Sequence, residues 1–319
     1  MTDLSESQAP ASQASALPAA VLYGLTASLI WGAWPVVSAF GIRQSLAAAD
    51  IAALRFLVAG LILLPLVIRN GTGNLGPGGL GWRRALFLSL GAGAPYVLVT
   101  AGGLTYAPAG QGGIIGPSCM LVFATLGGWL LLGDRPPRQR LIGIALMLTG
   151  VVLIGGQTLG GYQAEQWQAE QWKGHLMFAC GGLLWASYTV ALRVWGADPL
   201  QATALVSVLS LLIYGPIYLL TAEPQLFAAP WTEIAEQAVF QGLAAAILAL
   251  ICYNRAVALL GAGRGAVFVT LVPAIAVLLA YPVLGEVPSA TDLAGAAMVT
   301  AGMVTALGLL PVKFWPVKS

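Results

Sequence analysis

The chain has 319 residues, of which 58% are hydrophobic and 8% are charged. A soluble domain carries about 25% charged residues because its surface must be hydrated, so this composition excludes a soluble fold and predicts an integral membrane protein. The 14 basic and 12 acidic residues nearly balance, and the chain has no basic run of the kind that follows a phosphate backbone. We therefore expect the lipid bilayer, and no nucleic acid, as its partner.

Residue types that carry metal or catalytic chemistry are scarce. Cys119, Cys180 and Cys252 lie in apolar stretches without CxxC spacing, so we interpret them as small packing residues. His175 is the only histidine, which excludes a site built on a pair of histidines. We expect no metal, no cofactor and no catalytic residue.

The first 17 residues are rich in Ser, Ala and Gln and include Asp3 and Glu6. They lack the basic segment that opens a signal peptide. We expect residues 1–17 to form a disordered tail, and the first hydrophobic stretch to be a retained helix.

Ten apolar stretches follow, each of a length that crosses a hydrocarbon core about 30 Å thick as a helix. Short connections rich in Gly, Pro, Asn and Asp separate them, as at residues 69–79. The sequence predicts an all-α membrane fold with helices at 18–42, 46–68, 85–104, 107–132, 140–156, 174–195, 200–221, 234–260, 265–284 and 290–310.

The distribution of Lys and Arg predicts the orientation, because loops rich in these residues stay cytoplasmic. An even number of helices places both termini on one side, and the opposite side holds only Arg43 and Lys173. We therefore expect both termini to be cytoplasmic in a bacterial inner membrane. The basic residues on the side of the termini are Arg69, Arg83, Arg84, Arg135, Arg138, Arg140, Arg193, Arg264, Lys313 and Lys318.

The second half of the chain repeats the first. The tripeptide LIW ending at Trp31 matches LLW ending at Trp185. Each copy has five helices, an odd number, so the second copy crosses the membrane in the opposite direction, as in the inverted repeats of alternating-access carriers. A shift of 152 positions also pairs Gly133 with Gly285, Asp134 with Glu286, Pro136 with Pro288, Leu141 with Leu293, Gly143 with Gly295, Ala145 with Ala297, and Gly150 with Gly302.

These features resemble the drug/metabolite transporter superfamily of the EamA type. The resemblance is carried by LGD and LGE at Asp134 and Glu286, the repeated prolines and glycines, Arg55 in the second helix, and LVPAIAVLLAYPVLGE at 271–286. It extends from about residue 20 to about residue 310. Helix four departs from the pattern, because Pro117 lies seventeen residues before Asp134 whereas Pro273 lies thirteen before Glu286.

The resemblance implies a first five-helix unit at 18–156, an external linker at 157–173, a second unit at 174–310 and a cytoplasmic tail at 311–319. It implies a carrier that exports small metabolites, with amino acids as the expected substrates. It also implies a structural or gating role for Arg55.

The candidate binding residues are those that lie near the middle of their helices, where such carriers keep their site. Tryptophan prefers the membrane interface, so Trp31 and Trp185 at mid-depth indicate a cavity wall, with helix packing as the alternative. Such a wall suits an apolar or aromatic substrate. The candidates for substrate binding are Trp31, Tyr96, Ser118, Trp185, Tyr188 and Thr270.

Three prolines, Pro35, Pro117 and Pro273, interrupt helical hydrogen bonding inside predicted helices. Because alternating access requires helices that bend, we expect these prolines to act as hinges, together with Arg55 as a gating residue.

The middle third of every predicted helix lacks Asp and Glu, whereas proton-coupled efflux of cationic drugs usually needs a carboxylate in the membrane. A phosphorylated substrate would need two or more basic residues. A neutral or zwitterionic substrate therefore fits best, with a multidrug or other metabolite efflux carrier of the same fold as the alternative.

Two other classes fit less well. A membrane enzyme should show clustered Asp, His or Lys at the membrane boundary, and a channel should show rings of like charge or carbonyl filters. The exact substrate, the direction, the coupling ion and a possible homodimer stay open.

Overall fold

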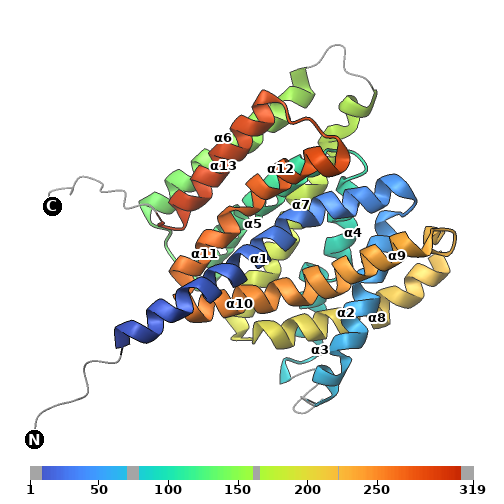
Figure 1. The fold of residues 1–319 in the computed structure, drawn as a ribbon, viewed down its shortest axis with the longest axis horizontal. Coiled ribbons are helices and arrows are strands. Elements are labelled where there is room, and N and C mark those ends of the chain that lie inside the picture. The colour runs from blue at the N-terminus through green and yellow to red at the C-terminus, as the bar shows by residue number, and fades with distance from the viewer. Residues whose placement is uncertain (1–8, 70–78, 161–165, 222, 310–319) are drawn as a thin grey trace, which may run out of the picture.

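The computed structural model describes residues 9–69, 79–160, 166–221 and 223–309 (Figure 1). Within this part, nine helical segments are long and apolar enough to cross a membrane, and Ala290–Ala306 forms a tenth, shorter apolar helix. The predicted all-α membrane fold is confirmed.

The first copy contains five crossings, and the third of them is divided into two helices at Gly93. The backbone at Gly93 is extended, and Pro95 lies in the first turn of the next helix, where its missing N–H is not needed. The helices are α1 (Ala9–Gln44), α2 (Ala48–Arg69), α3 (Trp82–Ala92) with α4 (Ala94–Gly103), α5 (Ala109–Leu132) and α6 (Arg138–Gly160).

The second copy also contains five crossings, and two of them are interrupted. Its third crossing includes a π-helical stretch, η3, and its fourth is divided at Leu271, two residues before Pro273. The helices are α7 (Gln166–Trp195), α8 (Pro199–Thr221), α9 (Trp231–Gln237) continued by η3 (Ala238–Leu248) and α10 (Ala249–Leu260), α11 (Ala262–Thr270) with α12 (Val272–Leu284), and α13 (Ala290–Ala306); a short 3₁₀ turn, η2 (Gln225–Phe227), precedes α9.

Two helices, α1 and α7, begin well before the residues that the sequence predicted. Helix α1 begins at Ala9, so the second half of the segment expected to be a disordered tail is helical, in keeping with its content of alanine, the strongest helix former. Helix α7 begins at Gln166, inside the predicted linker. Residues 1–8, 161–165 and 310–319, on which the rest of the tail and linker predictions fall, lie outside the described part.

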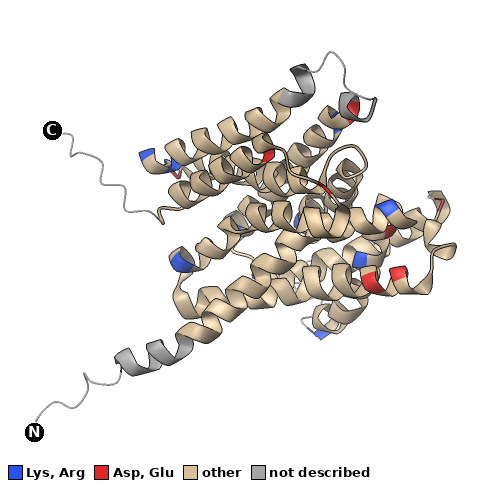
Figure 2. Cartoon of the chain, turned by 45° about the horizontal axis from the view of Figure 1, so that its top comes forward, with Lys and Arg blue, Asp and Glu red and all other residues tan. Residues whose placement is uncertain are grey.

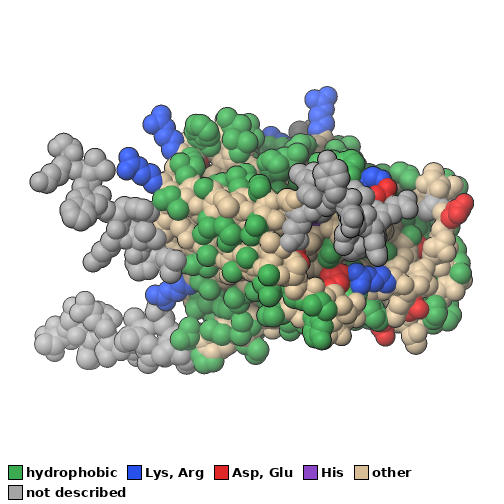
Figure 3. All heavy atoms as spheres, turned by 90° about the horizontal axis from the view of Figure 1, so that it is seen from above, with side chains coloured by type: hydrophobic (Ala, Val, Ile, Leu, Met, Phe, Trp, Pro, Cys, Tyr) green, Lys and Arg blue, Asp and Glu red, His purple; other side chains and the backbone are tan. Residues whose placement is uncertain are grey.

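We call the end of the bundle at which α1 begins the proximal end, and the end at which α1 finishes the distal end. Helix α13 finishes at the proximal end (Figure 1). Charged residues lie mainly toward the two ends of the bundle (Figure 2). Apolar side chains cover much of the middle of the face in Figure 3, and the visible acidic side chains lie toward its right-hand, distal half. This distribution suits a bundle that crosses a bilayer from one end to the other.

The two copies are joined by a seam of glycines between α6 and α13. A Cβ atom added at Gly150 would lie 2.9 Å from the carbonyl oxygen of Gly295, and one added at Gly302 would lie 2.7 Å from that of Gly143. The helices can approach this closely only because these positions lack side chains. The repeated glycines of the sequence thus face each other across the interface between the copies.

Candidate substrate cavity

A cavity of about 320 Å³ lies between the two copies, lined by α1, α2, α4 and α5 of the first and by α7, α10, α11 and α12 of the second. This volume is within the range of small-molecule sites, which starts near 300 Å³. Its walls are mainly aromatic and apolar. The aromatic lining residues are Trp31, Trp34, Tyr96, Phe178, Trp185 and Tyr253.

Two aromatic pairs form walls of this cavity. Trp31 packs against Tyr253 with ring centroids 5.3 Å apart, and Trp185 packs against Tyr96 at 4.9 Å. Each pair joins the first helix of one copy to the third crossing of the other. The walls therefore follow the internal repeat, and each wall is shared by both copies.

Glycines on α5 and α7 form another part of the cavity lining. A Cβ atom added at Gly182 would lie 2.8 Å from the carbonyl oxygen of Gly116, so the two helices are in close contact there. Gly116 itself lines the cavity, and a Cβ atom added to it would meet no atom within 4 Å. A side chain at position 116 would thus project into open cavity space.

Arg55 is the one charged residue among the described residues that line the cavity, and it is only 9% exposed. Asp50 lies five residues before Arg55 on α2 and is the acidic residue of that helix. In the structure Asp50 accepts hydrogen bonds from the Tyr218 hydroxyl and the Ala47 amide. The described residues form three ion pairs, and Arg55 takes part in none of them.

The predicted hinge prolines occupy two kinds of position. Pro35 and Pro117 lie inside α1 and α5 and line the cavity, whereas Pro273 is buried at the start of α12 and is not among the lining residues. A proline inside a helix leaves the carbonyl four residues earlier without its backbone partner. For Pro35 and Pro117 these carbonyls belong to Trp31 and Gly113, which also line the cavity.

Of the six predicted binding residues, Trp31, Tyr96 and Trp185 line the cavity, whereas Ser118, Tyr188 and Thr270 do not. The hydroxyl groups of Ser118 and Thr270 are buried and donate to backbone carbonyls of their own helices. Tyr188 packs in an apolar cluster with α3 and α8 and touches the cavity only through Trp185. All three side chains are buried within the bundle.

A buried polar network beside the cavity was missing from the sequence predictions. Trp34 donates its indole N–H to Gln241, 2.8 Å away. The Gln241 amide nitrogen donates to Ser38 and to Gln237, and Gln237 donates to the carbonyl of Val37. The signal in the sequence is a pair of glutamines four residues apart, hence on one helix face, in an otherwise apolar stretch.

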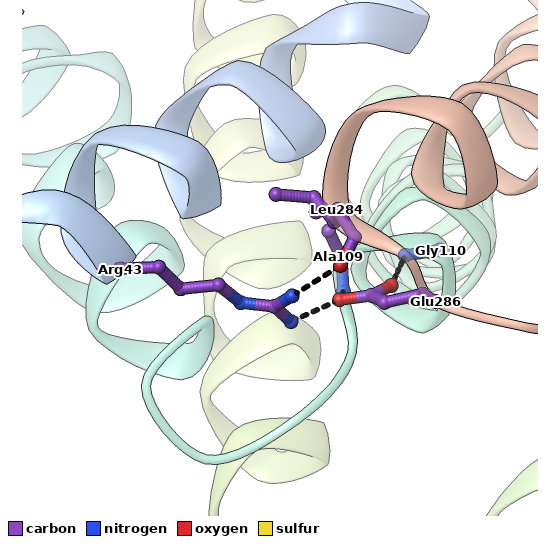
Figure 4. Close-up of polar contacts among 5 residues, drawn as sticks. All are labelled: Arg43, Ala109, Gly110, Leu284 and Glu286. Atoms are coloured by element: carbon purple, nitrogen blue, oxygen red, sulfur yellow. Dashed lines mark hydrogen bonds and ion pairs between the residues drawn. The ribbon is translucent and has the colours of Figure 1, made fainter.

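At the distal end an ion pair links α1 to the fourth crossing of the second copy. Arg43 pairs with Glu286 and also donates to the carbonyl of Leu284, 3.1 Å away. Glu286 further accepts from the amides of Ala109 and Gly110, at 3.1 and 3.3 Å (Figure 4). We call this set of contacts the distal latch. The carboxylate lies at the N-terminus of α5, where the helix dipole favours negative charge.

A related ion pair lies at the proximal end. Arg193, near the end of α7, donates to Asp134 at 2.7 Å. Asp134 is the repeat counterpart of Glu286, and α7 is the counterpart of α1. We call this pair the proximal latch. Its side chains are 61% and 47% exposed, whereas that of Glu286 is 14% exposed, so the distal latch is the better buried of the two.

Known proteins with similar sequences or folds include transporters. The relative named "Uncharacterized transporter YyaM", from Bacillus subtilis, is 26% identical over 195 residues, which are 59% of this chain and 61% of the relative. The match thus spans less than two thirds of that relative's length. A solved crystal structure with 20% identity shares the fold, with a TM-score of 0.60 over 91% of this chain and 96% of that one.

A family model described as "EamA-like transporter family" matches residues 18–156 and again residues 172–308. The two matches include both aromatic walls of the cavity and the residues of both latches. The chain belongs to the EamA-like transporter family.

Proposed function

We propose that this transporter is an alternating-access carrier that exports small neutral or zwitterionic metabolites, in particular amino acids, across a bacterial inner membrane. The observation that carries the proposal is the cavity between the two copies, with its two repeat-related aromatic walls. Each wall is made from both copies. A relative movement of the copies would therefore rearrange both walls together, as alternating access requires.

The two latches support the mechanism. They are repeat-related and lie at opposite ends of the bundle, so exchanging the conformations of the two copies would exchange their environments. The distal latch is the more buried one, which fits a conformation closed at that end. The proposed orientation, with both termini in the cytoplasm, makes the distal end the external one.

The chemistry of the lining supports an amino-acid substrate. Aromatic walls suit an apolar side chain, and the carbonyls of Trp31 and Gly113, released by the prolines, are acceptors suited to an ammonium group. Within the described ranges the lining includes no carboxylate, whereas a carrier of cationic drugs usually relies on one.

A cavity-filling variant tests the proposal. Gly116→Leu places a side chain in open cavity space, and leucine is a better helix former than glycine, so the fold should persist while substrate is excluded. We expect saturable uptake of radiolabelled leucine and phenylalanine by wild-type proteoliposomes, and at least a tenfold loss for Gly116→Leu. Imposing a pH gradient in the same assay reports proton coupling.

The matched control is Gly156→Leu, the same substitution at an exposed glycine in α6 with no atom near its added Cβ. It should transport like wild type. Equal uptake by Gly116→Leu and wild type would show that this cavity is not the transport site. Uptake no greater than in empty liposomes would contradict the amino-acid substrate.

A further inference from the structure

Arg55 is a buried charge that forms no ion pair with any of the residues the structure describes. It is the eighth residue of α2, so it lies about 10 Å along the helix from its distal end. At this depth a charged side chain is normally paired or faces a water-filled cavity, and it marks a functional site by default. Arg55 lines the cavity and has no ion pair and no hydrogen bond to any described residue.

The neighbouring acceptors are already occupied. Asp50, the acidic residue closest to it on α2, bonds the hydroxyl of Tyr218 and the amide of Ala47. Three carboxylates of the described residues pair with other basic residues: Glu286 and Asp134 in the two latches, and Glu170 with Lys173. Because Arg55 lines the cavity and no described residue accepts from it, its guanidinium keeps N–H donors for a bound ligand.

We infer that Arg55 binds the carboxylate of the substrate, and that the cavity selects monocarboxylates with an apolar or aromatic body. This inference rests on the proposed carrier function and names the substrate class more closely. A guanidinium matches a carboxylate with two parallel hydrogen bonds. One arginine without a second basic residue in the lining balances one negative charge, which disfavours phosphates and dicarboxylates.

The amino group of such a substrate contributes less to binding than its carboxylate does. The described lining offers it aromatic faces and backbone carbonyls but no carboxylate. The carboxylate meets a full opposite charge, whereas the ammonium meets only neutral groups. The cavity therefore binds a carboxylate ligand that lacks an amino group. It discriminates against an amine that lacks a carboxylate.

Matched ligands test this on the unmodified protein. The probes are L-phenylalanine, 3-phenylpropionate and L-phenylalaninamide, together with leucine, 4-methylpentanoate and leucinamide, titrated into purified protein by calorimetry. We expect the amino acids and the acids that lack the amine to bind within about tenfold of each other. The amides should bind at least about tenfold more weakly, the loss expected for a hydrogen bond to a charged group.

Variants assign the effect to Arg55. Arg55→Gln should weaken binding of the acids at least tenfold and leave that of the amides unchanged, and Arg55→Lys should recover part of the loss because it keeps the charge without the fork. Arg255→Gln is the matched control, since Arg255 also lies within a helix but is exposed, and it should bind like wild type. The ligand comparison on wild type stands even if Arg55→Gln fails to fold.

The outcomes separate this inference from the carrier function. Equal binding of acids and amides, or unchanged binding of the acids to Arg55→Gln, would overturn the role of Arg55 and leave the carrier standing. If no acid binds wild type but neutral or cationic metabolites do, the monocarboxylate class is overturned and the carrier still stands. If no metabolite binds or is transported, both are overturned.

Discussion

Gln241 is the most highly connected polar side chain next to the cavity. It is fully buried, accepts from the Trp34 indole and donates to Ser38 and Gln237. Its hydrogen bonds fix the Trp34 ring, which lines the cavity, to the π-helical stretch of the second copy. Polar groups inside a membrane protein are tolerated when every partner is satisfied, and this network meets that condition.

Replacing Gln241 by leucine should therefore destabilise the protein. The substitution keeps side-chain size close to that of glutamine but leaves the Trp34 N–H and the Ser38 hydroxyl without partners, each at a cost of about 1 to 3 kcal/mol. We expect a lower midpoint of thermal unfolding in detergent and weaker substrate binding.

The control for Gln241→Leu is Gln201→Leu, at an exposed position near the start of α8. It should change the unfolding midpoint little. An unchanged midpoint in Gln241→Leu would show that the network contributes nothing to stability.

The residues of the candidate site that could be predicted from the sequence are those of a type rarely found at their depth in a membrane. Trp31, Trp185 and Arg55 are unusual at mid-membrane depth, and all three line the cavity. Ser118 and Thr270 are ordinary helix residues. Their depth could be counted from the helix ends. Whether they face the cavity depends on how the neighbouring helices pack, which the sequence alone does not give.

Helices α6 and α13 approach each other closely enough for direct backbone contact. Along α6 and α13, glycines at Gly143, Gly150, Gly295 and Gly302 allow carbonyl oxygens to approach the opposite helix. In a bilayer, such packing replaces the hydrophobic effect as the source of helix association. The seam is therefore a point where one added side chain has a large effect.

Gly150→Leu should separate α6 from α13. The new side chain would meet the carbonyl oxygen of Gly295 at 2.9 Å and Val299 at 3.1 Å, and overpacking of this kind costs about 1 to 3 kcal/mol. We expect reduced yield of monodisperse protein and a lower unfolding midpoint. Gly156→Leu, on the same helix but in open space, should match wild type, and equal loss in both variants would argue against the seam.

The number of crossings and their positions were predictable from apolar length alone, but the interruptions were not. The breaks at Gly93 and Leu271 each lie two residues before a proline, Pro95 and Pro273, whereas Pro35 and Pro117 lie in continuous helices. All four prolines lack a backbone N–H donor. Whether the helix then breaks depends on the groups packed around it.

The molecule as a whole is built from two copies, and its working parts occur in repeat-related pairs. The aromatic walls and the latches each have a counterpart in the other copy. Their surroundings differ, because a single conformation cannot place both ends of the bundle in the same state. The difference in burial between the two latches is the clearest sign of this asymmetry.

The latches should therefore respond unequally to loss of their charge. In Glu286→Gln the distal latch loses a charge that accepts from Arg43 and two helix N-terminal amides, which shifts the balance between conformations by about 2 kcal/mol, roughly thirtyfold. In Asp134→Asn an exposed pair is lost, which contributes at most about 1 kcal/mol. Glu286→Gln should thus open the distal end, and Asp134→Asn should leave it closed.

Spin labels at positions 105 and 287, both exposed near the distal end, measure this opening in a background in which the native cysteines are replaced by serine. The expected result is a longer distance population in Glu286→Gln that is minor in wild type and in Asp134→Asn. Identical distance distributions in all three proteins would mean that the distal latch does not control access. Because the two substitutions are chemically alike and occupy repeat-related positions, an unequal response can come only from the different surroundings of the two latches.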